Sequence, residues 1–159
     1  MQDKKMKIIE GNLITMALHG DFDVIVHGCN CFCQMGAGIA LDIKYTFPKA
    51  YAADQQTVKG DLKKLGKISY SRQNLFVKDS PELIVVNGYT QYNYGGQSRR
   101  VDYKAMHSVF AEVKKHFSGK RIGYPAIGAG LARGNLNTIL EIIEQELTGE
   151  DHTIVKFVK

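Results

Sequence analysis

The sequence has 159 residues, of which 44% are hydrophobic and 23% are charged. These values are typical of globular proteins and exclude a disordered, collagen-like or coiled-coil chain, and the length corresponds to one domain at roughly 150 residues per domain. The formal net charge is +5 without a basic block or tail, which suits a small anionic ligand at least as well as a nucleic acid. No segment approaches the ~18 apolar residues of a membrane span or forms a signal peptide, so we expect a cytoplasmic protein without a membrane partner.

Strand and helix patterns alternate along the chain. Residues 23–27 form an apolar, β-branched run typical of a buried central strand, and apolar residues spaced by three and four over 102–117 predict an amphipathic helix. In chain order, the patterns predict strand 7–9, helix 13–19, strand 23–27, helices 39–44 and 50–58, a hairpin of strands 67–71 and 74–77, strand 83–87, helix 102–117, strand 121–125, helix 136–147 and strand 153–158. This order predicts a single α/β domain over residues 1–159, with a mixed sheet covered on both faces by helices.

Two glycine loops carry the strongest functional signal. Residues 33–40 (CQMGAGIA) and 125–131 (PAIGAGL) each follow a predicted strand and precede a helix. Glycine lets the backbone approach an anion closely, and both loops should emerge at the carboxyl edge of the sheet, where α/β proteins bind ligands. Neither loop has the complete Rossmann or Walker pattern. A single G-x-G is usually only a tight turn, but two such loops in equivalent positions favour a site that holds a diphosphate between them.

Cys29, Cys31 and Cys33 alternate over five residues. An odd number of cysteines this close together forms no disulfide framework and indicates a reducing compartment. Structural zinc takes four ligands, commonly as two pairs, and the sequence has no second cysteine pair, so we expect no metal site and no cofactor. The favoured interpretation is three buried thiols, and a cysteine nucleophile is the alternative.

Several polar residues near the loops are candidates for ligand contact. His27 and Asn30 lie at the end of the buried strand, directly before the first loop. We favour ligand contact for Asn30, whereas for His27 ligand contact and a structural cap both remain open. Asp42, one turn into the next helix, is either an exposed helix residue or a base. The tyrosines in residues 89–94 are either loop packing or a stacking wall for a base or ribose.

Three segments resemble the ligand-binding motifs of macro domains. The first motif is IVHGCN at residues 25–30 followed by MGAGIA at 35–40, the second is YPAIGAGL at 124–131, and Gly11-Asn12-Leu13 stands where the family typically has Gly-Asp-Leu or Gly-Asp-Ile. The match runs from about residue 5 to the C-terminus in the family's order of elements. The form is closest to small stand-alone macro proteins, the branch that includes ADP-ribose-1″-phosphate phosphatases and terminal ADP-ribose protein glycohydrolases.

The resemblance implies a three-layer α/β/α domain that binds ADP-ribose over the sheet edge. It also implies that Asn12 meets the adenine amino group, that Leu13 contacts the base through its backbone, and that Asn30 contacts the distal ribose. The implied phosphate loops consist of Gly36, Ala37, Gly38 and Ile39 in the first loop and Ile127, Gly128, Ala129, Gly130 and Leu131 in the second.

Departures from the family pattern affect two expectations: the strength of adenine binding and the type of reaction. Asn12 replaces the usual aspartate, and because its carbonyl accepts a hydrogen bond without a charge we expect weaker adenine binding. The terminal glycohydrolases use a lysine and an aspartate where this sequence has Gln91 and Ala132. Neither residue can form a lysine adduct or act as its acid/base partner, which argues against that chemistry.

The leading prediction is a phosphatase that hydrolyses ADP-ribose-1″-phosphate to ADP-ribose and phosphate. Asn30 would orient the distal ribose or the attacking water, His27 is a candidate acid or base, and Asp42 is a weaker base candidate. One alternative is a non-catalytic reader of free or protein-linked ADP-ribose, and another is a hydrolase that removes ADP-ribose from acidic side chains of proteins. The weakest alternative is a single-stranded RNA binder that uses the tyrosines of 89–94 and Arg99-Arg100.

Overall fold

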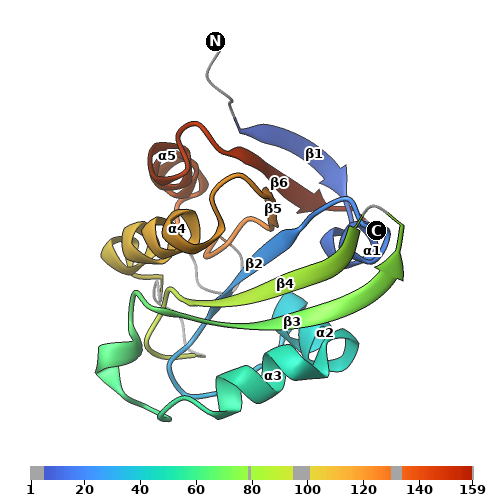
Figure 1. The fold of residues 1–159 in the computed structure, drawn as a ribbon. Coiled ribbons are helices and arrows are strands. Elements are labelled where there is room, and N and C mark those ends of the chain that lie inside the picture. The colour runs from blue at the N-terminus through green and yellow to red at the C-terminus, as the bar shows by residue number, and fades with distance from the viewer. Residues whose placement is uncertain (1–5, 79, 95–100, 130–133, 159) are drawn as a thin grey trace.

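A mixed sheet of six strands forms the centre of the fold (Figure 1). The computed structural model describes residues 6–78, 80–94, 101–129 and 134–158. The strands are β1 (Lys7–Gly11), β2 (Val24–Cys29), β3 (Ile68–Val77), β4 (Ser80–Tyr89), β5 (Arg121–Tyr124) and β6 (Asp151–Phe157). Their order is β1-β6-β5-β2-β4-β3, and every neighbouring pair is parallel except the antiparallel pair β3–β4. The carboxyl ends of β1, β2, β4, β5 and β6 therefore lie at one edge of the sheet.

Helices cover both faces of the sheet, which confirms the predicted three-layer α/β/α architecture (Figure 1). Val24 and Val26 of β2 pack against one helical layer, and Ile25, which points the opposite way in the pleat, packs against the other. The first layer contains α4 (Tyr103–Phe117) and α5 (Leu136–Glu146), and the second contains α1 (Leu13–Leu18), α2 (Gly38–Thr46) and α3 (Pro48–Gln55). A short 3₁₀ helix, η1 (Leu62–Lys64), precedes β3.

Local sequence signals explain where the helices begin. The Asp102 side chain accepts a hydrogen bond from Ala105 N at 2.9 Å and so caps α4, and Asn135 caps α5 through Thr138 N. The apolar positions of α4 are then buried against the sheet, and each buried side chain of valine, methionine or phenylalanine size contributes roughly 1.5–3 kcal/mol. These buried residues are Ala105, Met106, Val109, Phe110, Val113 and Phe117.

The predicted hairpin at residues 67–77 is wrong. Residues 68–77 form the single strand β3, which pairs with β4 at residues 68–74 and again at Val77, opposite Ser80. Exposure alternates through residues 71–78 without a break, because Arg72 and Gln73 lie in the strand and contact Glu82 and the Leu83 carbonyl of β4. The irregular step lies further along, between Asn74 and Val77, where Phe76 has a positive φ of 56°.

Two further boundaries differ from expectation. The helix predicted at 50–58 begins earlier, at Pro48, because proline is favoured in the first turn of a helix, and it ends earlier, at Gln55.

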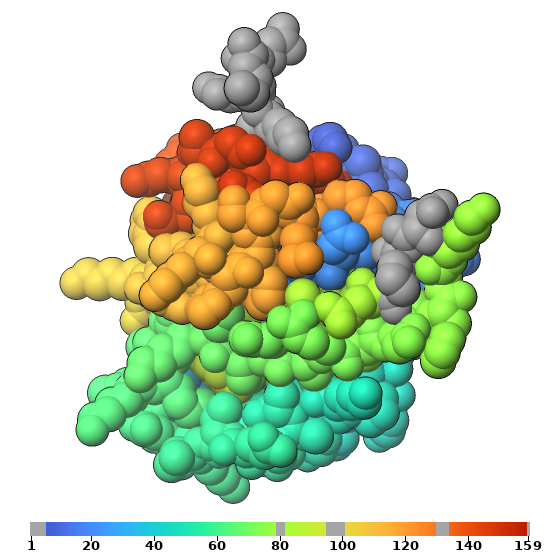
Figure 2. Space-filling model, in the orientation of Figure 1, coloured from blue at the N-terminus to red at the C-terminus, as the bar shows by residue number. Residues whose placement is uncertain are grey.

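Strand β3 forms one edge of the sheet, and Figure 2 shows it as a green band between α4 above and the turquoise α3 below. Among the residues that the structure describes, no helix is long and apolar enough to cross a membrane.

Candidate functional site

The three sequence motifs come together at the carboxyl edge of the sheet. The first glycine loop follows β2, the second follows its neighbour β5, and Asn12 follows β1. Neighbouring strands are ~4.8 Å apart, so the end of β1 is displaced from the end of β2 by roughly 14 Å along this edge. A ligand that touches all three motifs must therefore be elongated, and a single small anion would not reach them.

The first loop presents an open backbone to solvent. Gly36, Ala37 and Gly38 are exposed, and a Cβ added to Gly36 would meet nothing within 4 Å. Gly38 has a φ of 58°, a conformation that favours glycine, and it is the first residue of α2. Ala37, at the N-cap, provides no side-chain hydrogen bond. Since the first N–H groups of a helix have no partner within it, those of α2 can bind an anion over this loop.

Asn30 shapes the loop that leads to these glycines. Its Oδ1 accepts a hydrogen bond from Phe32 N at 2.9 Å, and its Nδ2 donates to the Gln34 carbonyl at 2.9 Å. The side chain is buried, with 8% exposed. One amide hydrogen and one lone pair of Oδ1 remain beyond these two contacts, so ligand contact by Asn30 stays a prediction, whereas its role in fixing the loop is directly visible.

The second loop requires glycine for steric reasons. Gly128 has a φ of 80°, and an added Cβ would lie 2.7 Å from Val101 Cγ2. Gly134 is equally restricted, because a Cβ added to it would lie 2.6 Å from Val101 Cγ1. The predicted ligand residues Gly130 and Leu131 lie outside the described residues, as does Ala132.

The residues beneath the second loop include one that the sequence did not single out. Ile127, predicted as a ligand residue, is buried, and Ala129 is half-buried. A Cβ on Gly28 would meet both Ile127 Cγ2 and Thr90 Oγ1 at 2.8 Å, so β2 needs glycine at this point. Thr90 is fully buried and its hydroxyl has no hydrogen-bond partner among the described residues. Its place at the end of β4 was the only sequence signal for it.

His27 lies in the core, on the side of the sheet that faces α3. Its ring is fully buried, and Nε2 is 2.7 Å from Asn87 Oδ1. Asn87 Nδ2 donates to the Ala50 carbonyl, which can only accept, so Oδ1 accepts and His27 carries its proton on Nε2. Burial lowers the pKa of His27 to about 4, although the Asn87 contact opposes this shift. These contacts favour the structural alternative for His27, and its acid/base role stays a prediction.

Tyr89 extends the same buried network rather than forming a stacking wall. Its hydroxyl donates to Asp54 Oδ1 at 2.8 Å and lies 2.8 Å from Ser69 Oγ, which in turn accepts from Asn87 Nδ2 at 3.1 Å. Burial raises the pKa of Tyr89 above its ordinary value, and burial also raises the pKa of Asp54 while Tyr89 and Lys64 oppose that rise. A continuous hydrogen-bonded chain thus joins α3 to β2, β3 and β4.

The other two tyrosines lie further along the loop after β4. The Tyr92 ring packs against Phe32 with a centroid distance of 4.9 Å, and its hydroxyl donates to the Gly60 carbonyl. Tyr94 is 57% exposed and lies 6.1 Å from Phe32 by ring centroids. Tyr92 is therefore loop packing, whereas Tyr94 still has a free face.

The remaining predicted residues divide between backbone and side-chain positions. Asn12 is exposed and caps α1 by accepting a hydrogen bond from Thr15 N at 3.0 Å through Oδ1. The Leu13 side chain is buried, which leaves its backbone for a ligand, and Ile39 is half-buried. Asp42 is exposed on α2, four residues after Gly38 and so on the same face of the helix.

The three cysteines are free and buried, as the favoured interpretation predicts. Within the described ranges, no three His, Cys, Asp or Glu side chains are grouped as metal ligands. Burial raises the pKa of both Cys29 and Cys31, which disfavours the thiolate form that a nucleophile needs.

Known proteins resemble this chain in sequence or in fold. No family model matches the sequence. The 17.5 kDa protein in the tk-vs intergenic region of Enterobacteria phage T4 is 35% identical over 144 residues, which cover 87% of this chain and 88% of the phage protein. The macrodomain of Thermus aquaticus DarG has a TM-score of 0.70 at 19% identity and covers 97% of this chain and 98% of its own. Thermosipho africanus DarTG, solved in complex with ADP-ribose, has a TM-score of 0.73 at 19% identity and covers 98% of this chain and 43% of its own.

The fold is therefore that of a macrodomain, as the resemblance of the three sequence segments implied. The sequence relationship is closer to a phage protein than to any of these solved macrodomains: the chain belongs to the family of the phage T4 17.5 kDa protein.

Proposed function

We propose that this protein binds ADP-ribose along the carboxyl edge of its sheet and hydrolyses ADP-ribose-1″-phosphate to ADP-ribose and phosphate. The observation that carries the proposal is the pairing of two glycine loops on the adjacent strands β2 and β5, one of them opening into the amino end of α2. Backbone N–H groups from such loops suit a diphosphate, and a structural neighbour of the same fold was solved with ADP-ribose.

The ligand would lie with its base at the end of β1 and its diphosphate between the loops. Asn12 and the Leu13 backbone would contact the base. Asn12 Oδ1 already accepts from Thr15 N, so the other terminal atom of its amide, Nδ2, is a donor where an aspartate would offer a second acceptor. The adenine amino group is also a donor, so this site recognises adenine less well than a site with aspartate.

The distal ribose would lie over the first loop, close to Asn30. In the phosphatase reaction, a water oxygen bonds to phosphorus while the bond from phosphorus to the 1″ oxygen breaks, and that oxygen takes up a proton. The loop N–H groups would stabilise the charge on the phosphoryl oxygens, and Asn30 would hold the loop and orient the ribose or the water. Asp42, exposed on the face of α2 that carries Gly38, is the base candidate that solvent can reach.

A specific observation also favours the second candidate, a reader without turnover. His27 is buried on the α3 side of the sheet, and its pKa of about 4 leaves it neutral at pH 7, which disfavours it as a general acid. The amide of Asn30 is already bonded within its loop. A site that binds ADP-ribose through backbone groups alone needs none of these side chains.

The test combines binding with product release. ADP-ribose at ~100 times its dissociation constant should stabilise the fold by about 2.7 kcal/mol, and phosphate should appear from ADP-ribose-1″-phosphate. Asn30→Ala should reduce phosphate release by ~10²-fold or more while weakening ADP-ribose binding far less. Asp42→Asn is the matched test of the base.

Each result separates the candidates. Binding without phosphate release supports the reader, and release of ADP-ribose from an ADP-ribosylated protein would support de-ADP-ribosylation instead. No change in melting temperature at saturating ADP-ribose would refute the assignment of this ligand.

A further inference from the structure

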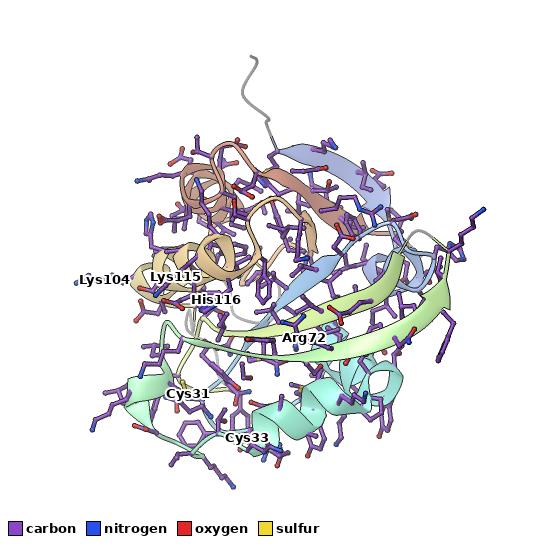
Figure 3. All side chains as sticks on the ribbon, viewed as in Figure 1. Cys31, Cys33, Arg72, Lys104, Lys115 and His116 are labelled. Atoms are coloured by element: carbon purple, nitrogen blue, oxygen red, sulfur yellow. The ribbon has the colours of Figure 1, made fainter. Side chains whose placement is uncertain are left out.

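Cys33 and Lys64 form a buried contact that ADP-ribose binding does not use. Cys33 precedes Gly36 by three residues, and Lys64 ends η1, so the contact joins segments 31 residues apart. The distance from Lys64 Nζ to Cys33 Sγ is 3.6 Å, and the two residues are 6% and 8% exposed. Figure 3 shows Cys33 beside the end of α3 and Cys31 between α3 and η1, at the lower left of the view.

Lys64 is held in place by neutral partners. Its Nζ donates to the Cys31 carbonyl at 3.0 Å and lies 4.8 Å from the centre of the Tyr89 ring. None of the ion pairs within the described residues includes Lys64. A buried ammonium without a carboxylate at ion-pair distance costs solvation energy, and its longer-range attraction to the buried Asp54 carboxyl offsets only part of that cost. The nitrogen of this lysine is fixed beside a sulfur atom.

Cys33 is held just as firmly. It is one of two non-glycine residues in the described chain with a positive φ, at 58°, and its carbonyl accepts from Gln55 Nε2 at 2.8 Å. Its Sγ also lies 3.3 Å from the Asp54 carbonyl and 3.5 Å from Thr57 Oγ1. Of the Thr57 hydroxyl and the Lys64 amine, which both contact this sulfur, the amine is the stronger nucleophile.

The other two sulfur atoms point to different partners. Cys29 Sγ lies 3.5 Å from His27 Nε2, and Cys31 Sγ lies 3.6 Å from the Gln91 carbonyl. An oxidised Cys33 therefore has an amine beside it, whereas a disulfide would require one of these thiols to turn away from its present contact.

We propose that Cys33 and Lys64 are a modification site in which peroxide drives a sulfur–nitrogen cross-link. Hydrogen peroxide oxidises the Cys33 thiol to a sulfenic acid, and one water is released. Lys64 gives one proton to solvent, its lone pair attacks Cys33 Sγ, and the S–O bond breaks. The hydroxyl leaves as a second water with a proton from the nitrogen, and the product is a sulfenamide. The sulfur is oxidised by two electrons, one peroxide is reduced to two waters, and a thiol reductant reverses the link.

The cross-link would have two physical consequences. It removes from the interior a positive charge that has no carboxylate at ion-pair distance among the described residues. It also ties the segment before the first glycine loop to η1, which restricts the unfolded chain in the way that a disulfide does. We therefore expect the melting temperature to rise by a few degrees after oxidation and to return after reduction.

The test is peptide mapping of the purified chain after treatment with hydrogen peroxide. The expected product is a peptide pair joined through Cys33 and Lys64, lighter than the separate peptides by two hydrogen atoms and separated by dithiothreitol. Lys64→Arg keeps a cation but lacks the nucleophilic amine, so it should leave a sulfenic acid that dimedone traps. Cys31→Ser is the matched control, and it should still form the cross-link.

Other products would overturn the proposal. A disulfide between two of the cysteines, or sulfinic acid at Cys33 in the wild-type chain without a cross-link, would exclude capture by the lysine. A link that retains the peroxide oxygen would exclude the condensation step. The wild-type measurement decides these outcomes even where a variant fails to fold, and none of them depends on ADP-ribose binding.

Discussion

Acidification should destabilise the protein through His27. The native ring is fully buried and neutral, and burial lowers its pKa from 6.5 to about 4. The unfolded chain takes up a proton near the ordinary value of 6.5, so between these two values the unfolded state binds more protons than the native state. The free energy of unfolding must then fall as the pH falls through this window, and it must be recovered as the pH rises.

The magnitude follows from the two pKa values. At pH 7 the difference in protonation is small, and at pH 5 it amounts to about 2 kcal/mol of lost stability from this one residue. His152 is also fully buried, and burial lowers its pKa as well, so it adds to the total in the same direction. A single pH series on the wild-type protein would therefore mix the two histidines.

A matched variant isolates His27. His27→Gln retains a donor that can reach Asn87 Oδ1 but does not titrate. Urea unfolding at pH 7 and pH 5 should show the wild-type protein losing about 2 kcal/mol more than the variant between the two values. Equal losses in both proteins would refute the conclusion that His27 is held neutral in the core.

Three further predictions concern the glycine loops, the candidate site for the adenine base and the buried hydrogen-bond network. Gly128→Ala should destabilise the fold by roughly 1–3 kcal/mol in thermal unfolding, because φ is 80° there and Val101 leaves no room. Gly36→Ala, whose Cβ meets open space, is its control, and it should keep the melting temperature while weakening ADP-ribose binding; a stability loss equal to that of Gly128→Ala would contradict this distinction. Asn12→Asp should tighten ADP-ribose binding by roughly 1 kcal/mol in calorimetry, because aspartate retains the cap and adds a charged acceptor; the same gain for inosine diphosphate ribose, whose base has an oxygen in place of the amino group, would show that Asn12 does not read the base. Tyr89→Phe should lower stability by roughly 1–3 kcal/mol in urea unfolding, because the buried Asp54 carboxyl and Ser69 hydroxyl lose their shared partner; unchanged stability would mean that the buried network is dispensable.

Short-range patterns in the sequence were sufficient for most of the architecture. The central strands β2 and β4 are buried on both faces and therefore consist of continuous apolar runs, and α4 shows its buried face as a period of three to four residues. The glycine loops were visible because positive φ angles and close packing leave glycine as the residue that fits, as Gly128 demonstrates. These features depend on each segment's own backbone and burial, so the sequence predicts them directly.

Long-range contacts decided what the sequence left open. Strand β3 was predicted as two pieces because nothing in residues 68–77 reveals that β4 pairs with residues 68–74 and again with Val77. The role of His27 was also left open by the sequence, because a histidine at that position can contact a ligand or be buried in the core. Its role depends on Asn87, 60 residues away, and on which face of the pleat the ring occupies. Likewise, nothing in the sequence distinguishes Lys64 from the other lysines. Only the packing of η1 against the segment before the first glycine loop places its amine beside Cys33. Residue identity determined which groups could meet, and the register and packing of distant segments determined which of them do.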